Sequence, residues 1–406
     1  MEKGRMREIK IMERQKLKFP KGFLWGAATS SYQIEGDNSN SDWWEWEQKG
    51  KTKEKSGEAC DYWNKFESDH EIAQSLNCNA FRISLEWSRI EPEEGKFSYE
   101  VIEHYRSLLK DLRNKNMKTV VTFWHWVSPI WFQNKYGFHK RESVEIFTRY
   151  GKIVVDELGD LIDIVVTINE PMMPLSFGFL IGKFPPGKIN PFAYKKASKN
   201  LAEAHKKIYT YSKEKNKNIP VGVTLLYNFF EPNNKNNPLD RLIISFCKRF
   251  WNESFANSIV GFMDYVGLDY YFHNKVSILG RRNENKKTVD IMGWEIYPEG
   301  IYESLKELEK LYDLPIYIME NGLPDARDKF RADFIKDHVA YVHQAIKEGV
   351  DVRGYFYWSL LDNYEWLLGY EPRFGLVEID YKTMERKIRP SAWEYAKICK
   401  NNELEV

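Results

Sequence analysis

The 406-residue sequence has few cysteines, and none of them stands beside another at a spacing that is typical of a metal site or a redox motif. The four are Cys60, Cys78, Cys247 and Cys399, and they are widely separated along the chain. We interpret them as free thiols of a protein from a reducing compartment. No cluster of histidine and aspartate has ligand spacing either, so the sequence predicts no metal and no cofactor.

The sequence also has no excess charge of one sign and no long hydrophobic run. Lys and Arg number 60 against 59 Asp and Glu, and this balance argues against nucleic acid or an anionic membrane as a partner. The stretch 1–18 is charged and never reaches the apolar core of a signal peptide, and a solvated tail is favoured over one that touches a membrane. We therefore expect a cytoplasmic protein whose partner is an uncharged small molecule. Assembly into a homo-oligomer is left open by the sequence.

Glycine and proline, at 24 and 16 residues, are too few for a disordered or fibrous chain, whereas aromatic residues are abundant. They make up 15% of the chain and include 14 Trp. Most of these residues are expected in the core or at its rim. Indole faces also stack on the apolar faces of sugar rings, which points to one class of ligand.

Strand-like and helix-like patterns alternate along the chain without a linker between them. The expected strands are Phe23–Thr29, Ala80–Ser84, Lys118–Trp124, Asp163–Asn169, Val221–Tyr227, Tyr265–Tyr271, Pro315–Gly322 and Gly354–Ser359. The expected helices are Asp61–Ser75, Tyr99–Asn114, Ser143–Glu157, Tyr194–Lys213, Leu242–Asn257, Glu299–Leu311 and Phe334–Glu348. The Trp-containing stretch Asp37–Lys55 is expected to be a structured loop. Eight such units predict an α/β fold, a single (β/α)8 TIM barrel over residues 19–406 behind a polar tail over residues 1–18.

Two of the expected strands end in a glutamate. Glu170 follows a Val/Ile run and precedes Pro171, and Glu320 follows Ile316–Met319 and precedes an Asn-Gly turn. The C-terminal ends of barrel strands meet in one active site, so these two carboxylates are expected to face each other. Further polar or aromatic side chains at strand ends are Gln33, Arg82, His125, Trp126, Asn169, Tyr271 and Trp358. Taken singly, Arg82 and His125 have equally good structural explanations as an ion-pair partner and a core histidine.

Two carboxylates across a sugar ring suffice for glycoside hydrolysis, with one as acid/base and the other as nucleophile or as base toward water. Glu170 has apolar and aromatic neighbours that would raise its pKa by desolvation and keep it protonated. Glu320 is expected to stay ionised through Arg82 and the hydroxyl of Tyr271, which suits a nucleophile.

Four segments of the sequence resemble the matching segments of the glycoside hydrolase family 1 β-glycosidases, and the resemblance as a whole extends from about Phe19 to Trp393. They are the N-terminal segment Phe23–Gly36, Thr167–Pro171 around the acid/base, Ile318–Gly322 around the nucleophile and the sugar-binding segment Trp358–Trp366. Segments such as Asp42–Trp44 and Glu86–Ile90 look most like archaeal-type members.

The resemblance implies an exo-acting, retaining double displacement on β-glucosides and related β-galactosides and β-fucosides, with carboxyl groups about 5 Å apart. By position, Glu170 is the acid/base and Glu320 the nucleophile, with Arg82, Asn169 and Tyr271 in support. The resemblance also implies that substrate is bound by Gln33, His125, Trp126, Asn169, Glu365 and Trp366, with Trp358 as the stacking floor.

The sequence departs from the family pattern at three places. Asp269 stands where the family usually has Asn, so that an extra acid would lie near the nucleophile and raise its pKa unless paired. Met319 replaces the usual Thr, and Leu367 and Leu368 follow Trp366 where many relatives have polar residues; they suggest an apolar rim suited to alkyl or aryl glycosides. Two alternatives stay open: a transglycosylase that accepts an alcohol in place of water, and a catalytically silent sugar-binding barrel.

Overall fold

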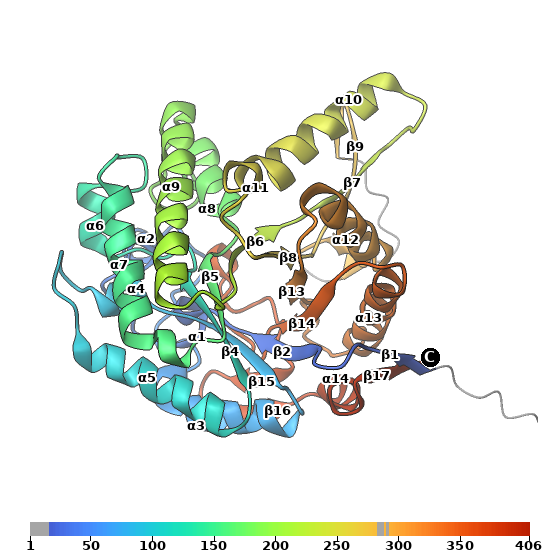
Figure 1. The fold of residues 1–406 in the computed structure, drawn as a ribbon, viewed down its shortest axis with the longest axis horizontal. Helices are drawn as coiled ribbons and strands as arrows, with labels where there is room; N and C mark the ends of the chain where they lie inside the picture. The colour runs from blue at the N-terminus through green and yellow to red at the C-terminus, as the bar shows by residue number, and fades with distance from the viewer. Residues whose placement is uncertain (1–15, 282–287, 290–291) are drawn as a thin grey trace, which may run out of the picture.

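The computed structural model describes residues 16–281, 288–289 and 292–406, and its centre is a closed parallel barrel (Figure 1). The strands neighbour one another in the order β13-β14-β2-β3-β4-β5-β6-β8, so the predicted TIM barrel is confirmed. Their bounds are β2 Leu24–Ala28, β3 Ala80–Ser84, β4 Lys118–Trp124, β5 Ile164–Ile168, β6 Val221–Leu226, β8 Tyr265–Asp269, β13 Ile316–Asn321 and β14 Val352–Trp358.

The barrel strands are apolar because helices cover them outside and side chains fill them inside. Every residue of β3, β5, β6, β8 and β13 is buried. The surrounding helices are confirmed with ends shifted by a few residues: α3 Tyr62–Ser75, α5 Tyr99–Asn114, α7 Ser143–Leu158, α9 Pro191–Lys215, α12 Glu299–Tyr312 and α13 Arg331–Lys347. Helix α9 starts earlier than predicted because the Asn190 side chain accepts hydrogen bonds from the N–H groups of Phe192 and Ala193 at 3.1 and 3.0 Å.

The prediction of a loop over Asp37–Lys55 is wrong for its middle part. Helix α2 spans Asp42–Gln48, and the hydroxyl of Ser41 caps it by accepting a hydrogen bond from the N–H of Trp44 at 3.2 Å. Trp43 is buried, with 1% of its surface exposed. The cluster of tryptophans therefore belongs to a short helix that packs on the body of the protein.

The connection from β6 to β8 differs most from the expectation. In place of one helix over Leu242–Asn257, α10 Pro238–Cys247 starts earlier, behind the cap of Asn237, and is followed by a π-helical turn at Lys248–Glu253 and by α11 Ser254–Ser258. A small sheet of β7 Phe229–Pro232, β9 His273–Ser277 and β10 Gly280–Arg281 was not predicted. Since β7 follows β6 and β9 follows β8, this sheet lies beyond the C-terminal ends of those barrel strands, with α10 against it (Figure 1).

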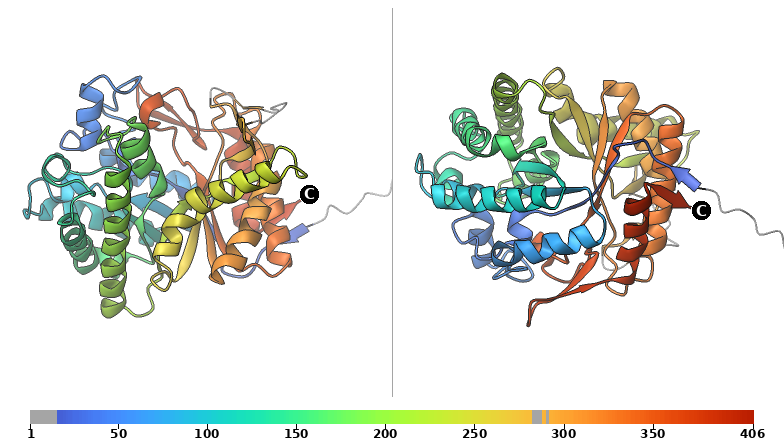
Figure 2. Two further views of the ribbon diagram at one scale, coloured as in Figure 1. Left: turned by 90° about the horizontal axis from the view of Figure 1, so that it is seen from above. Right: turned by 60° about the horizontal axis from the view of Figure 1, so that its bottom comes forward.

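The described chain ends meet beside the barrel. Strand β1 Lys16–Lys18 pairs antiparallel with β17 Glu403–Glu405, next to helix α14 Pro390–Asn401 (Figure 2). Residues 1–15 of the expected tail lie outside the described residues. The remaining elements are short: α1 Ser31–Ile34, α4 Trp87–Ile90, α6 Ile130–Lys135, 3₁₀ turns Gly159–Leu161 and Trp366–Leu368, α8 Met172–Ser176, a π-helical turn Phe177–Ile181, β11 Thr288–Val289, β12 Trp294–Glu295, β15 Val377–Asp380 and β16 Glu385–Ile388.

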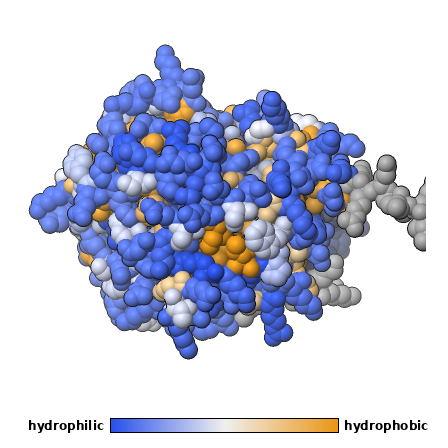
Figure 3. Space-filling view, turned by 90° about the horizontal axis from the view of Figure 1, so that it is seen from below, coloured by the Kyte–Doolittle hydropathy of each residue, from blue (hydrophilic) through white to orange (hydrophobic). Residues whose placement is uncertain are grey.

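The face in Figure 3 is mostly hydrophilic, with one larger apolar patch near its centre. Within the described ranges, no helix combines the length and the apolar character needed to cross a bilayer. All four cysteines lie in described segments as free thiols, and Cys60, Cys78 and Cys399 are buried.

Candidate active site

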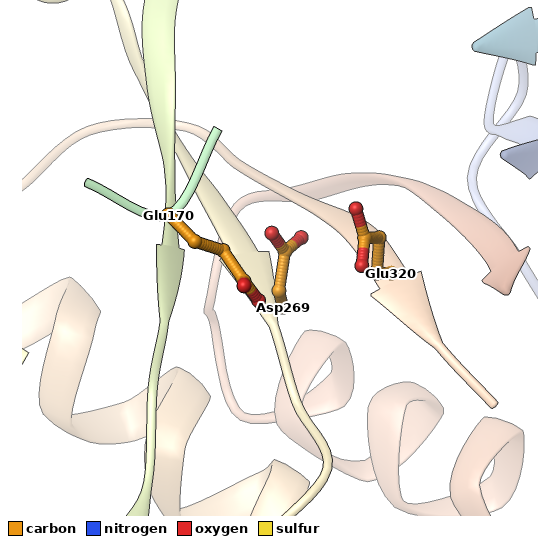
Figure 4. Close-up of side chains that lie close together, drawn as sticks. All are labelled: Glu170, Asp269 and Glu320. Carbon is orange, nitrogen blue, oxygen red and sulfur yellow. The ribbon is translucent and has the colours of Figure 1, made fainter. Parts of the chain in front are cut away.

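The two predicted glutamates meet at the C-terminal end of the barrel. Glu170 lies two residues after the end of β5, Glu320 is the last but one residue of β13, and Asp269 is the last residue of β8. One carboxylate oxygen of each lies within 4.8 Å of the others, and Figure 4 shows Asp269 between the two glutamates. This spacing is that of a retaining glycosidase and is too short for an inverting one, which needs room for a water molecule.

Glu320 is held by donors on both of its oxygens. Arg82 Nη1 donates to Oε1 at 2.7 Å, and the hydroxyl of Tyr271 donates to Oε2 at 2.8 Å, so both contacts expected from the sequence are present. Burial raises the pKa of Glu320, but the Arg82 charge and the two hydrogen bonds oppose this rise. Of the clustered carboxyl groups, Glu320 therefore has the best support for a negative charge.

Glu170 has a different environment. Its backbone is in the left-handed region, at φ 39°, and its N–H donates to the carbonyl of Thr224 at 3.1 Å. Its Oε1 is buried and receives no hydrogen bond from any residue that the structure describes. Burial raises the pKa of Glu170 well above its usual range, and the charges of Glu320 and Asp269 raise it further. This carboxyl group is thus suited to hold a proton.

A cavity of about 270 Å³ opens above these carboxyl groups. All predicted site residues line it except Arg82 and Asn169, and the lining members are Gln33, His125, Trp126, Glu170, Tyr271, Glu320, Trp358, Glu365 and Trp366. We refer to the polar members of this lining as the floor of the cavity. The arrangement therefore presents three carboxyl groups, an amide, an imidazole and a phenol to whatever enters the cavity.

Arg82 and Asn169 lie behind the floor. Asn169 Oδ1 accepts hydrogen bonds from Arg82 Nη2 and from the hydroxyl of Thr224, the latter at 2.6 Å, while its Nδ2 lies 3.1 Å from His125 Nε2. The role of Asn169 in binding a sugar hydroxyl stays a prediction; its side chain is fully buried and connects His125 with Arg82. Burial and the charge of Arg82 lower the pKa of His125 well below its usual range, which keeps this imidazole neutral.

Gln33 and Glu365 meet at one end of the floor. Gln33 Nε2 donates to Glu365 Oε2 at 3.1 Å, and Gln33 Oε1 is buried without a donor among the described residues. Burial, followed by the charge of Glu320, raises the pKa of Glu365 to about 8. Trp366 lies beside Trp126 with ring centroids 4.8 Å apart, so the aromatic wall is continuous there.

The mouth of the cavity is apolar, and most of it was missed by the sequence analysis. Leu367 and Leu368 were expected at a rim, and both line the cavity. The unpredicted lining residues are Met173, Phe177, Phe184, Leu226, Phe272, Met292, Trp294 and Phe374. Apart from Leu226, which ends β6, they come from connections whose conformation has no sequence signature, although Phe272 directly follows Tyr271 and was within reach of prediction.

The three carboxyl groups could also share a cation, and within the described ranges they are the one group of this kind. No sequence spacing indicates it, because the residues come from three separate strands. The guanidinium of Arg82 already lies 2.7 Å from Glu320 and 4.0 Å from Asp269. We therefore interpret the three residues as a cluster of carboxyl groups whose positive partner is the guanidinium of Arg82, and not as a metal site.

The comparisons with known proteins agree with this geometry. The family model described as glycosyl hydrolase family 1 matches residues 15–270 and 263–404. The chain belongs to this family. It is 34% identical to β-glucosidase A of Thermotoga maritima, over 96% of this chain and 99% of that protein. It is 31% identical to a β-galactosidase of Sulfolobus acidocaldarius, over 95% of this chain and 96% of that protein.

The solved structures include archaeal and bacterial relatives. The β-glycosidase from Pyrococcus horikoshii has a TM-score of 0.90 and 36% identity, with 97% of each chain covered. The Thermotoga maritima β-glucosidase in complex with glucoimidazole has a TM-score of 0.91 and 32% identity, over 96% of this chain and all of that one. The protein is therefore a retaining β-glycosidase of this family, which favours an active enzyme over the silent-barrel alternative.

Proposed function

We propose that this enzyme hydrolyses β-glucosides and β-galactosides from their non-reducing end, with Glu320 as nucleophile and Glu170 as acid/base. The observation behind this assignment is the difference in hydrogen bonding between the two carboxyl groups. Glu320 accepts from Arg82 and Tyr271, which favours the anion. Glu170 has a buried oxygen without a donor in the described part of the chain, which favours the protonated acid.

In the first step, Glu320 attacks the anomeric carbon while the bond to the leaving oxygen breaks and Glu170 gives its proton to that oxygen. In the second step, ionised Glu170 takes a proton from water, and the resulting hydroxide displaces Glu320 from the sugar. The closeness of the two carboxyl groups supports this sequence, because a nucleophile must reach the carbon itself.

The binding roles follow from position on the cavity floor. Gln33, Glu365 and His125 offer hydrogen-bonding atoms to sugar hydroxyls, and Trp358 offers a ring face. Trp126 and Trp366 close the wall beside them. Asn169, Arg82 and Tyr271 act in support, the first two from behind the floor.

The apolar mouth favours substrates with an apolar aglycone, such as alkyl and aryl glycosides, over phosphorylated or charged ones. Phe272, Trp294 and Leu368 are among its residues. An alcohol held at the same place would compete with water for the glycosyl-enzyme, so we also propose transglycosylation as a side reaction. Product analysis with added butanol measures its share.

The first experiment measures initial rates on a panel of p-nitrophenyl β-glycosides for the wild type and for Glu320→Ala, with and without sodium azide. Loss of turnover in the variant and recovery with azide, giving the α-glycosyl azide, supports Glu320 as nucleophile. The matched control is Glu378→Ala, an exposed carboxylate on β15 with 49% side-chain exposure. Absence of wild-type turnover on every β-glycoside, in folded protein, would contradict the proposal.

We further propose that the enzyme works in the cytoplasm. The described thiols are free, and three of them are buried, as suits a reducing compartment. Cell fractionation with an antibody against the chain tests this location, and recovery in the culture medium would contradict it.

A further inference from the structure

Asp269 is the one carboxyl group of the cluster to which the catalytic cycle assigns no role. It lies fully buried between Glu170 and Glu320, outside the cavity wall. Neither of its oxygens accepts a hydrogen bond from a residue that the structure describes, and the same is true of Oε1 of Glu170. Three buried carboxyl oxygens thus lie close together without a hydrogen bond from another described group, and such atoms are costly unless one of the acids itself supplies a donor.

The charges around Asp269 lead to the same conclusion. Arg82 is the nearby cation, and its Nη1 lies 2.7 Å from Glu320 but 4.0 Å from Asp269. Of the other groups, His125 is neutral because its pKa is lowered, and the phenols of Tyr265 and Tyr271 are neutral because their pKa values are raised. None of these groups therefore supplies a second positive charge. Glu365 adds a further acid on the cavity side. One guanidinium cannot balance three buried carboxylates, so two of them need protons.

We propose that Asp269 is a positioning residue that holds a proton in the working enzyme and donates it in a hydrogen bond to Glu170. This inference rests on the proposed roles of Glu170 and Glu320. When Glu170 has given its proton to the leaving group, its carboxylate has a partner in Asp269, and it is held in place as the base of the second step. The proton of Asp269 stays on Asp269 throughout, so no additional acid or base is consumed.

The pKa shifts are consistent with this role. Burial raises the pKa of Asp269 well above its usual range, the charge of Glu320 raises it further, and Arg82 opposes the rise. In Asp269→Asn an amide takes the place of the protonated acid with the same zero charge, so neither glutamate experiences a change in its electrostatic surroundings.

The test compares Asp269→Asn with Asp269→Ala. Both remove the titrating group, but only the amide keeps a donor toward Glu170. We expect Asp269→Asn to retain the wild-type kcat near neutral pH, with both limbs of kcat/KM unchanged, because the amide has the same charge as the protonated acid and keeps a donor toward Glu170. We expect Asp269→Ala to lose about tenfold in kcat, the value of one hydrogen bond to a charged group.

Three kinetic outcomes overturn the proposal. A downward shift of the limbs in Asp269→Asn means that Asp269 is ionised in the working enzyme. A kcat of Asp269→Ala equal to that of the wild type means that Asp269 does not hold Glu170 in place. Equal kcat values for the two variants mean that its donor has no role.

An infrared measurement on the resting enzyme is independent of hydrolysis and therefore separates this inference from the proposed function. The difference spectrum between wild type and Asp269→Asn should lose the C=O stretch of a protonated carboxylic acid, and loss of a carboxylate band in its place overturns the proposal. If Asp269→Asn fails to fold, Asp269→Ser supplies the same subtraction.

Discussion

The floor and the mouth of the active-site cavity are built in different ways. The floor comes from the ends of barrel strands, where Glu320 and Glu170 are placed by the closed hydrogen-bonded ring of the sheet. The mouth comes from connections after those strands and holds apolar side chains such as Phe272 and Leu368. Chemistry therefore depends on the rigid part of the fold and aglycone preference on the variable part, as is usual for barrels.

This comparison predicts that changes to the floor act on kcat and on the pH profile, whereas changes to the mouth act on KM for particular aglycones. The largest expected effect is that of Glu170→Gln. For an alkyl glycoside, whose leaving group needs a proton, kcat should fall by about 10²- to 10⁴-fold. For an activated aryl glycoside the first step should be affected less. A drop of equal size for both leaving groups would contradict the acid/base role, and Glu378→Gln is the control.

The next effect is that of Arg82→Lys, which keeps a positive charge but cannot donate to Glu320, Asn169 and the carbonyl of Met319 together. We expect about a hundredfold loss in kcat/KM. Arg82 lowers the pKa of Glu320, so weakening this contact raises that pKa, and the acid limb should move to higher pH. An acid limb that stays in place, in a variant with native melting behaviour, would contradict this account.

A smaller effect is expected for Tyr271→Phe, which removes one hydrogen bond from Glu320. Activity should fall about tenfold, with a smaller shift of the acid limb in the same direction. The matched control is Tyr265→Phe at the start of β8, the strand that ends two residues before Tyr271. The hydroxyl of Tyr265 donates to the carbonyl of Val165 at 2.8 Å. The control should lower the melting temperature without shifting the acid limb of the pH profile. An acid limb that shifts in both variants would show a general effect of lost packing.

The smallest effect concerns the mouth. Leu368→Ser should raise KM for octyl β-glucoside about threefold and leave KM for methyl β-glucoside unchanged, because only the long aglycone buries apolar surface there. Leu368 is 38% exposed, and Leu239→Ser on α10, where the leucine is 51% exposed and outside the cavity, is the control. Equal changes for both substrates would show that Leu368 does not contact the aglycone.

The barrel itself was predictable because its strands are short Val/Ile-rich runs and its helices are amphipathic. For β3 and β4 the predicted and observed bounds are identical. Prediction failed in the connection from β6 to β8, where helix α10 and the sheet of β7 and β9 depend on contacts between segments that are distant in sequence. It also failed at α2, although the i, i+3 spacing of Trp43 and Trp46 and the Ser41 cap are local helix signals that were available.

The site was predicted residue by residue where a side chain follows a strand, as for Glu170 and Glu320. The sequence also indicated an acid near the nucleophile at Asp269, and it lies there. The sequence did not indicate that the side chains of Asn169 and Arg82 lie outside the cavity lining, where they contact its residues. Whether a residue at a strand end lines the cavity or lies behind it depends on the direction of its side chain relative to the barrel axis.

The sequence by itself determined the class of fold and the pair of carboxylates, because both follow from local patterns: apolar strands between helices, and a glutamate where a strand ends. Only the tertiary structure decided how the charges are shared. Asp269, Glu170 and Glu320 are far apart in the chain, and their interaction energies depend on distances and burial that arise when β5, β8 and β13 close into one barrel around Arg82.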